Sequence, residues 1–113
     1  MTLYATDWSI TSDITPEWAV RVSRDGALVW RLSWLPGLLL THGQAAVGMK
    51  LDELLSVPDG VYDRRLLVEA DACAGHIGLT RASVVMLLVQ RVAAQLRDAW
   101  TTAAERGAAL DIR

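Results

Sequence analysis

The chain has 113 residues, of which 52% are hydrophobic and 21% are charged, and its formal net charge is −2. A chain of this length forms one domain, residues 1–113, around a single core, and this composition excludes a generally disordered protein. Neither half of the sequence carries the basic excess that accompanies binding to a phosphate backbone.

Three features of the sequence indicate the cellular compartment of the protein. A single cysteine, Cys73, excludes an internal disulfide and favours a reducing environment. The first ten residues, MTLYATDWSI, have neither the basic segment nor the apolar core of a signal peptide. The longest apolar run, residues 84–89, is too short to span a bilayer. We therefore expect a soluble cytoplasmic protein with no membrane segment.

Residues 1–37 predict a three-stranded antiparallel meander. The first strand covers residues 3–10, where Tyr4, Thr6, Trp8 and Ile10 alternate and would share one face. The last strand is expected to end at a type II turn centred on Pro36 and Gly37, because proline cannot donate to the ladder.

The second and third strands form a hairpin whose register depends on its loop. A two-residue loop, Asp25-Gly26, would place the two apolar faces on opposite sides of the sheet. A three-residue loop that begins at Arg24 instead pairs apolar residues with one another: Val22 with Leu28, Val20 with Trp30, and Trp18 with Leu32. We therefore predict the three-residue loop, with Gly26 in the left-handed conformation.

Residues 38–107 predict three helices packed largely on the apolar face of the meander. Thr41 and Gln44 form a capping-box pattern, so the first helix is expected to start at His42 and to stop before the turn signal at residues 58–60. The second helix is expected over residues 62–76. The third and longest is capped by Thr80, runs to about residue 105 and is ended by Gly107, leaving residues 108–113 as a tail.

The long third helix carries more apolar side chains than one small sheet can cover. Residues at i, i+3 and i+4 spacing are expected to face the core of the domain, namely Val84, Leu87, Leu88, Leu96 and Trp100. A second apolar side is left over, which comprises Val85, Met86, Val89, Val92 and Ala93. A twofold contact would bury this patch against its own copy, so these five residues are the candidate self-association surface of a dimer.

Residues 30–49, WRLSWLPGLLLTHGQAAVGM, resemble a group of small uncharacterised actinobacterial proteins that carry the motif W-x-x-x-W-L-P-G-R-x-L-T-x-x-Q-A. Leu38 stands where that motif has arginine, and Gly43 stands where it usually has asparagine. The resemblance covers about twenty residues. It implies an actinobacterial or phage origin and assigns no activity.

A looser resemblance covers residues 70–88. The spacing of Ala74, Gly78, Leu79, Val84 and Leu87 is similar to a helix-turn-helix core, and the segment from Gly78 also resembles the helix junction of ribbon-helix-helix repressors. The side chains that would point outward from such a recognition helix are valine and methionine, which cannot read polar base edges. The candidate phosphate contacts are Arg64, Arg65, Arg81 and Arg91. Nearby acids offset their charge.

The sequence offers little for catalysis or metal binding. His42 and His76 have no carboxylate or cysteine at full ligand spacing, and the pair Cys73 and His76 is at most a partial site. The glycines are scattered singly, and no Gly-x-Ser-x-Gly elbow occurs. We therefore expect no enzyme activity, no cofactor and no metal.

These observations together predict an α+β domain that acts as a non-enzymatic interaction or regulatory module. We expect it to be a homo-oligomer, in the simplest case a dimer, with a protein partner as a further option. The alternative is a DNA-binding transcriptional regulator of the helix-turn-helix or ribbon-helix-helix type. Salt-dependent binding to random duplex DNA distinguishes the two classes.

Overall fold

The computed structural model describes residues 2–57 and 63–111, and the side chains only as far as residue 106. Within these residues an antiparallel meander of five strands precedes three helices. The strands are β1 (Leu3–Ala5), β2 (Ser9–Ser12), β3 (Trp18–Arg24), β4 (Ala27–Leu32) and β5 (Leu35–Leu40), and the helices are α1 (His42–Leu55), α2 (Arg64–His76) and α3 (Arg81–Asp111). The predicted α+β class is confirmed, whereas the predicted number of strands is wrong.

The predicted first strand is in fact a hairpin, β1 and β2, with a turn at residues 6–8. The Thr6 side chain explains the break, because its Oγ1 accepts hydrogen bonds from the backbone N–H groups of Trp8, at 3.4 Å, and Ser9, at 3.0 Å. Such a local bond offers the backbone an alternative to the ladder. Ile10 therefore lies in the core while Tyr4 and Trp8 are exposed.

The β3–β4 hairpin has the two-residue loop, so the predicted three-residue loop is wrong. Arg24 pairs with Ala27 and Val20 pairs with Arg31. Both loop residues have positive φ, 52° at Asp25 and 79° at Gly26, as a type I′ turn requires. The prediction failed because it assumed that the valines of β3 face the core.

The buried side chain of β3 is Ala19 instead. It pairs with the fully buried Leu32 of β4, whereas Val20 and Val22 lie half-buried on the opposite face of the sheet. Both faces of the sheet are therefore partly apolar. The small Ala19 leaves room for α1 to approach.

Strand β5 replaces the predicted turn at Pro36 and Gly37. The chain reverses at Ser33 and Trp34, and β5 then runs beside β4 with a register shift. Because β5 is the edge strand of the sheet, a proline without an N–H can lie in it without removing a ladder hydrogen bond from a neighbour.

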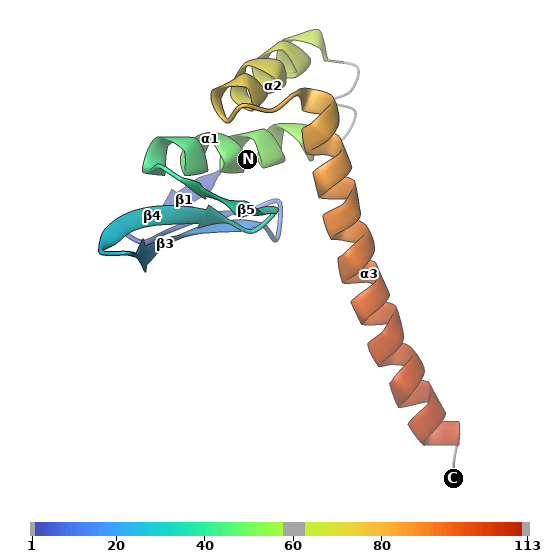
Figure 1. The fold of residues 1–113 in the computed structure, drawn as a ribbon. Coiled ribbons are helices and arrows are strands. Elements are labelled where there is room, and N and C mark those ends of the chain that lie inside the picture. The colour runs from blue at the N-terminus through green and yellow to red at the C-terminus, as the bar shows by residue number, and fades with distance from the viewer. Residues whose placement is uncertain (1, 58–62, 112–113) are drawn as a thin grey trace.

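Helix α1 covers the inner face of the sheet, as Figure 1 shows. It begins at His42 with the predicted capping box, in which Thr41 Oγ1 accepts from the Gln44 N–H at 3.2 Å and Gln44 Oε1 accepts from the Thr41 N–H at 3.0 Å. Gly48 of α1 lies directly over Leu32 of the sheet. This contact places α1 at the centre of the core.

Helix α2 packs on α1, and α3 leaves the body of the domain (Figure 1), so the prediction that all three helices cover the sheet is wrong. The Asp63 side chain caps α2 by accepting from the Arg65 and Leu66 N–H groups. Helix α3 continues to Asp111, past Gly107. The predicted turn at residues 58–60, the start of the second helix at residue 62 and the last two tail residues lie outside the described residues.

Replacement of Gly48 by alanine tests the close packing of α1 on the sheet. A Cβ at this position would lie 2.5 Å from Cδ2 of the fully buried Leu32. We expect Gly48→Ala to lower the free energy of unfolding by about 1–2 kcal/mol, because overpacking outweighs the better helix propensity of alanine. Gly43→Ala on the same helix, where a Cβ meets only Thr41 Oγ1 at 3.9 Å, is the control and should be neutral or stabilising. Equal effects of the two changes in urea denaturation would contradict this packing.

Replacement of Gly26 by alanine tests the hairpin loop. An alanine held at a φ of 79° should lower the free energy of unfolding by about 1–2 kcal/mol. Gly37→Ala is the matched control, since Gly37 is not among the positive-φ glycines and a Cβ there meets nothing within 4 Å. Thermal or urea unfolding measures both variants, and a neutral Gly26→Ala would argue against the type I′ turn.

Candidate interaction surface on α3

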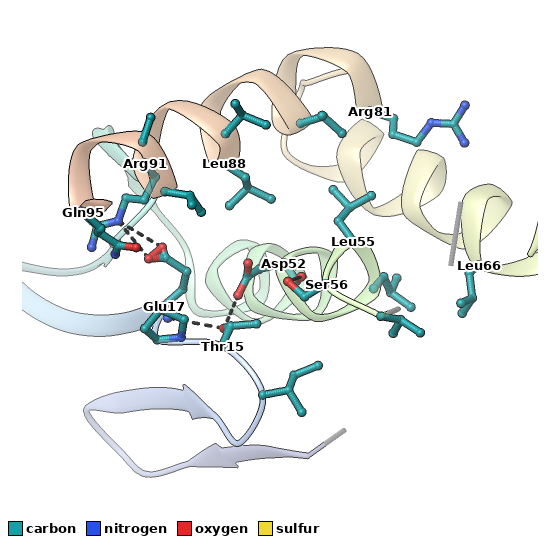
Figure 2. A pocket seen from close by; sticks show the side chains of 18 of the residues that line it. Thr15, Glu17, Asp52, Leu55, Ser56, Leu66, Arg81, Leu88, Arg91 and Gln95 are labelled. Carbon is teal, nitrogen blue, oxygen red and sulfur yellow. Dashed lines mark hydrogen bonds and ion pairs between the residues drawn. The ribbon is translucent and has the colours of Figure 1, made fainter. Parts of the chain in front are cut away.

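A groove of about 810 Å³ runs along α3 where this helix passes the body of the domain (Figure 2). Its walls come from the β2–β3 connection at residues 14–17, the end of α1, the first turn of α2, and α3 itself from Arg81 to Leu96. Most of the lining side chains are aliphatic. A surface of this shape and composition favours an apolar occupant.

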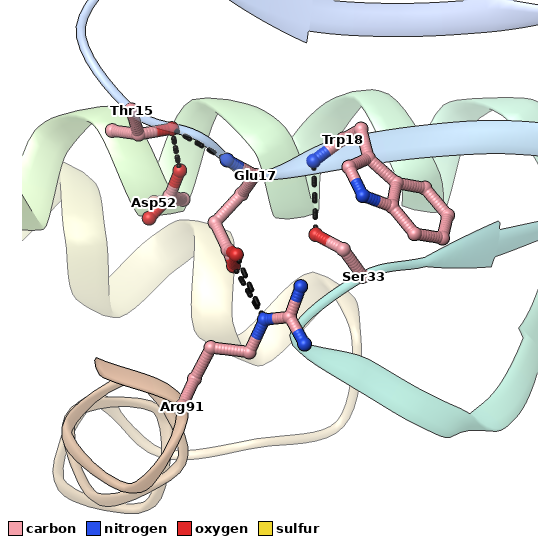
Figure 3. Close-up of polar contacts among 6 residues, drawn as sticks. All are labelled: Thr15, Glu17, Trp18, Ser33, Asp52 and Arg91. Atoms are coloured by element: carbon pink, nitrogen blue, oxygen red, sulfur yellow. Dashed lines mark hydrogen bonds and ion pairs between the residues drawn. The ribbon is translucent and has the colours of Figure 1, made fainter. Parts of the chain in front are cut away.

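An ion pair links the two sides of the groove. Arg91 of α3 donates through Nε to both carboxylate oxygens of Glu17, at 2.9 and 3.1 Å (Figure 3). The Glu17 side chain is only 4% exposed, while that of Arg91 is 35% exposed. The pair therefore neutralises a buried carboxylate and ties α3 to the segment that precedes β3.

Two neighbouring acids of α1 bind the end of β2 and the β2–β3 connection to that helix. Thr15 donates its hydroxyl to Asp52, and Ser12 donates its hydroxyl to Glu53 Oε2 at 2.6 Å. The backbone beside them is also fixed, because the Trp18 N–H donates to Ser33 Oγ at 2.9 Å (Figure 3). The polar wall of the groove is thus held by contacts between α1, the β2–β3 connection and the sheet.

Burial raises the pKa of Asp52 from 3.8 to about 6. The hydroxyl of Thr15 opposes this shift because it stabilises the charged carboxylate, whereas the negative charges of Glu17 and Glu53 add to it. The carboxyl of Asp52, which lines the groove, therefore changes its charge near pH 6.

The five residues of the candidate self-association surface lie on the exposed side of α3. Val85 is 41%, Val92 is 52% and Val89 is 58% exposed, and Met86 and Ala93 are exposed beside them. All of them except Met86 also line the groove.

The same apolar side continues beyond these five residues. The sequence placed Leu96 and Trp100 in the core of the domain, but they are 65% and 77% exposed. Val84, Leu87 and Leu88 do pack against the core. The error arose because the helical period alone extends the core-facing stripe along the whole helix, whereas the second half of α3 leaves the body of the domain (Figure 1).

The four arginines proposed as phosphate contacts do not gather at one place. Arg91 pairs with Glu17, and Arg81 pairs with Asp71 at 3.4 Å. Arg64 and Arg65 are exposed at the start of α2. Two of the four cations are therefore already partnered by carboxylates within the chain.

The other candidate groups lie apart from the groove. His42 contacts the Trp30 ring, with 4.9 Å between ring centroids, and His76 is exposed at the end of α2. Cys73 is buried, and burial raises the pKa of its thiol. Over residues 2–57 and 63–111, no three His, Cys, Asp or Glu side chains are arranged to hold a metal ion.

Among the helices of the described chain, none alone has the length and hydropathy to cross a membrane, although the pair α2 and α3, bent by 88°, passes the same test of length and composition.

No protein-family model, curated protein or solved structure matches the sequence or the fold. The surface described above is therefore interpreted from its own geometry.

Replacement of Asp52 by asparagine tests the raised pKa. The folded state holds a proton on Asp52 up to about pH 6, whereas the unfolded chain releases it near pH 3.8, so this group makes folding less favourable as pH rises through that window. We expect the stability of Asp52→Asn relative to the unmodified protein to increase between pH 4 and pH 7. Asp98→Asn, on the exposed part of α3, is the control. A stability difference for Asp52→Asn that does not change with pH would show that the carboxyl titrates normally.

Proposed function

We propose that this protein is a non-enzymatic interaction module that forms a homodimer through α3. The observation that carries the proposal is the apolar side of α3, which stays exposed although the helix begins in the core at Val84. Monomeric soluble proteins rarely leave a contiguous apolar surface of this extent open, and such surfaces usually mark a contact with another protein.

The spacing of the exposed residues supports a helix as the partner. Apolar residues recur at alternating intervals of four and three, namely Val85, Val89, Val92, Leu96, Ala99 and Ala103. This is the spacing of a coiled-coil seam, in which each side chain inserts between residues of a facing helix. We call these six residues the α3 seam. A second copy of the chain supplies a facing helix of matching length and pattern.

The rest of the described chain offers no cover for the seam beyond the groove. Helix α2 packs on α1 and meets only the start of α3, and the inner face of the sheet is occupied by α1. The side chains of residues 97–106 are exposed on every side of the helix. An intermolecular contact is thus the simplest way to remove the seam from water.

DNA binding is kept as a competing function and is not favoured. The ion pairs of Arg81 and Arg91 reduce the free positive charge near α3, and the net charge of the chain is −2. A regulator should bind random duplex DNA with an affinity that falls steeply as salt increases, whereas an interaction module should show no such binding at physiological salt.

Sedimentation of seam variants tests the dimer. The unmodified protein should sediment as a dimer at tens of micromolar, and the double variant Val85→Glu and Val89→Glu should sediment as a folded monomer, because two charges cannot be buried unpaired in the contact. Gln90→Glu and Ala94→Glu, two exposed positions on the side of α3 away from the seam, form the matched control and should remain dimeric. The proposal is overturned by an unmodified protein that is monomeric at this concentration.

A further inference from the structure

We infer that the two α3 helices pack antiparallel, with the end of α3 from each copy lying in the groove of the other. Leu96 and Trp100 of the second copy would be the side chains that fill the groove. This inference rests on the proposed homodimer and specifies its geometry.

The groove and the seam are continuous. Val85, Val89, Val92 and Leu96 line the groove and are also the first four seam residues. A helix that pairs with this part of the seam must therefore lie inside the groove, between α3 and the walls contributed by α1 and the β2–β3 connection.

The shape of the molecule selects which part of a second α3 can enter. The first half of α3 lies beside its own α1, α2 and β2–β3 connection, which form the walls of the groove, whereas residues 97–106 extend away from the body with exposed side chains (Figure 1). A parallel arrangement would bring two bulky first halves together. An antiparallel arrangement brings a bare helix to each groove, and the twofold axis makes both insertions at once.

Positions along the helix agree with this arrangement. For an axis near Val92, Leu96 of the second copy lies beside Leu88, and Trp100 of the second copy lies about one helical turn further along, beside Val85. Val85 lies one helical turn from Arg81, so Trp100 would enter the groove toward the end that Arg81 lines. Trp100 is 77% exposed in the single chain, and large aromatic side chains of this kind act as anchors in interfaces.

The size and charge of the side chains in the second half of α3 also agree with the antiparallel arrangement. The distal seam residues Ala99 and Ala103 are small and would face Val85 and Arg81, which permits close approach of the two helices. Within residues 97–106 the charged residues are two bases and two acids, and none of them is one of the six seam residues: Arg97, Asp98, Glu105 and Arg106. Insertion therefore leaves these charges outside the seam.

Cysteine cross-linking determines the direction of the helices. In a Cys73→Ala background, copies carrying Val85→Cys are mixed with copies carrying Ala99→Cys and treated with a short bis-maleimide. The antiparallel arrangement predicts efficient linkage in the mixture and little linkage in either variant alone, since an axis near Val92 places residue 85 opposite residue 99. Linkage of Val85→Cys to itself, with no linkage between Val85→Cys and Ala99→Cys copies in the mixture, would show a parallel dimer and overturn the inference.

Substitution of Trp100 by alanine tests the insertion itself. The dimer dissociation constant should increase at least tenfold with an unchanged circular dichroism spectrum of the monomer, because this side chain is exposed in the single chain. Arg97→Ala, on the same exposed part of α3, is the control and should change the constant less than threefold. A dimer that is indifferent to Trp100→Ala and Leu96→Ala overturns the insertion but leaves the proposed dimer intact, whereas a monomeric unmodified protein overturns both.

Discussion

The close contact between α1 and the inner face of the sheet is the constraint on which the remaining structure depends. It requires a small residue on each side, Ala19 in β3 and Gly48 in α1, so that the helix can lie against Leu32. With α1 fixed there, its acids Asp52 and Glu53 accept hydrogen bonds from the hydroxyls of Thr15 and Ser12. The groove wall is thus a consequence of how closely helix and sheet approach.

The helical part of the fold was more predictable from the sequence than the sheet. Local signals determine helix starts, and the Thr41 capping box gave the first residue of α1 correctly. The prediction of the sheet was wrong where the local backbone conformation depends on packing with residues distant in the sequence. Arg24-Asp25-Gly26 permits two loops, and only the position of α1 decides that Ala19, and not Val20, faces inward. Likewise, an alternation pattern of apolar residues does not indicate that the Thr6 hydroxyl breaks the first strand or that Pro36 lies in an edge strand.

The candidate surface was predictable in kind but not in extent. An excess of apolar residues around Val85 and Val89 can be read from the helical period, because it depends on the helix alone. The groove is different, since it joins residues 14–17 to α3, and the Glu17–Arg91 pair spans 74 positions of sequence without a local signature. The exposure of Trp100 depends on where α3 leaves the body, which no periodicity encodes.

The departure of α3 from the body has a consequence for how the helix itself is maintained. Isolated helices shorter than about 12–15 residues are marginal in water, and most helical stability in proteins comes from packing of an apolar face. Residues 97–106 lack such packing within one chain, so in the proposed dimer their helical order would be coupled to occupation of the groove of the second copy. Dilution of such a dimer would expose this segment to local unfolding. Amide exchange and protease cleavage beyond Leu96 would then depend on protein concentration, while the sheet and α1 stay protected.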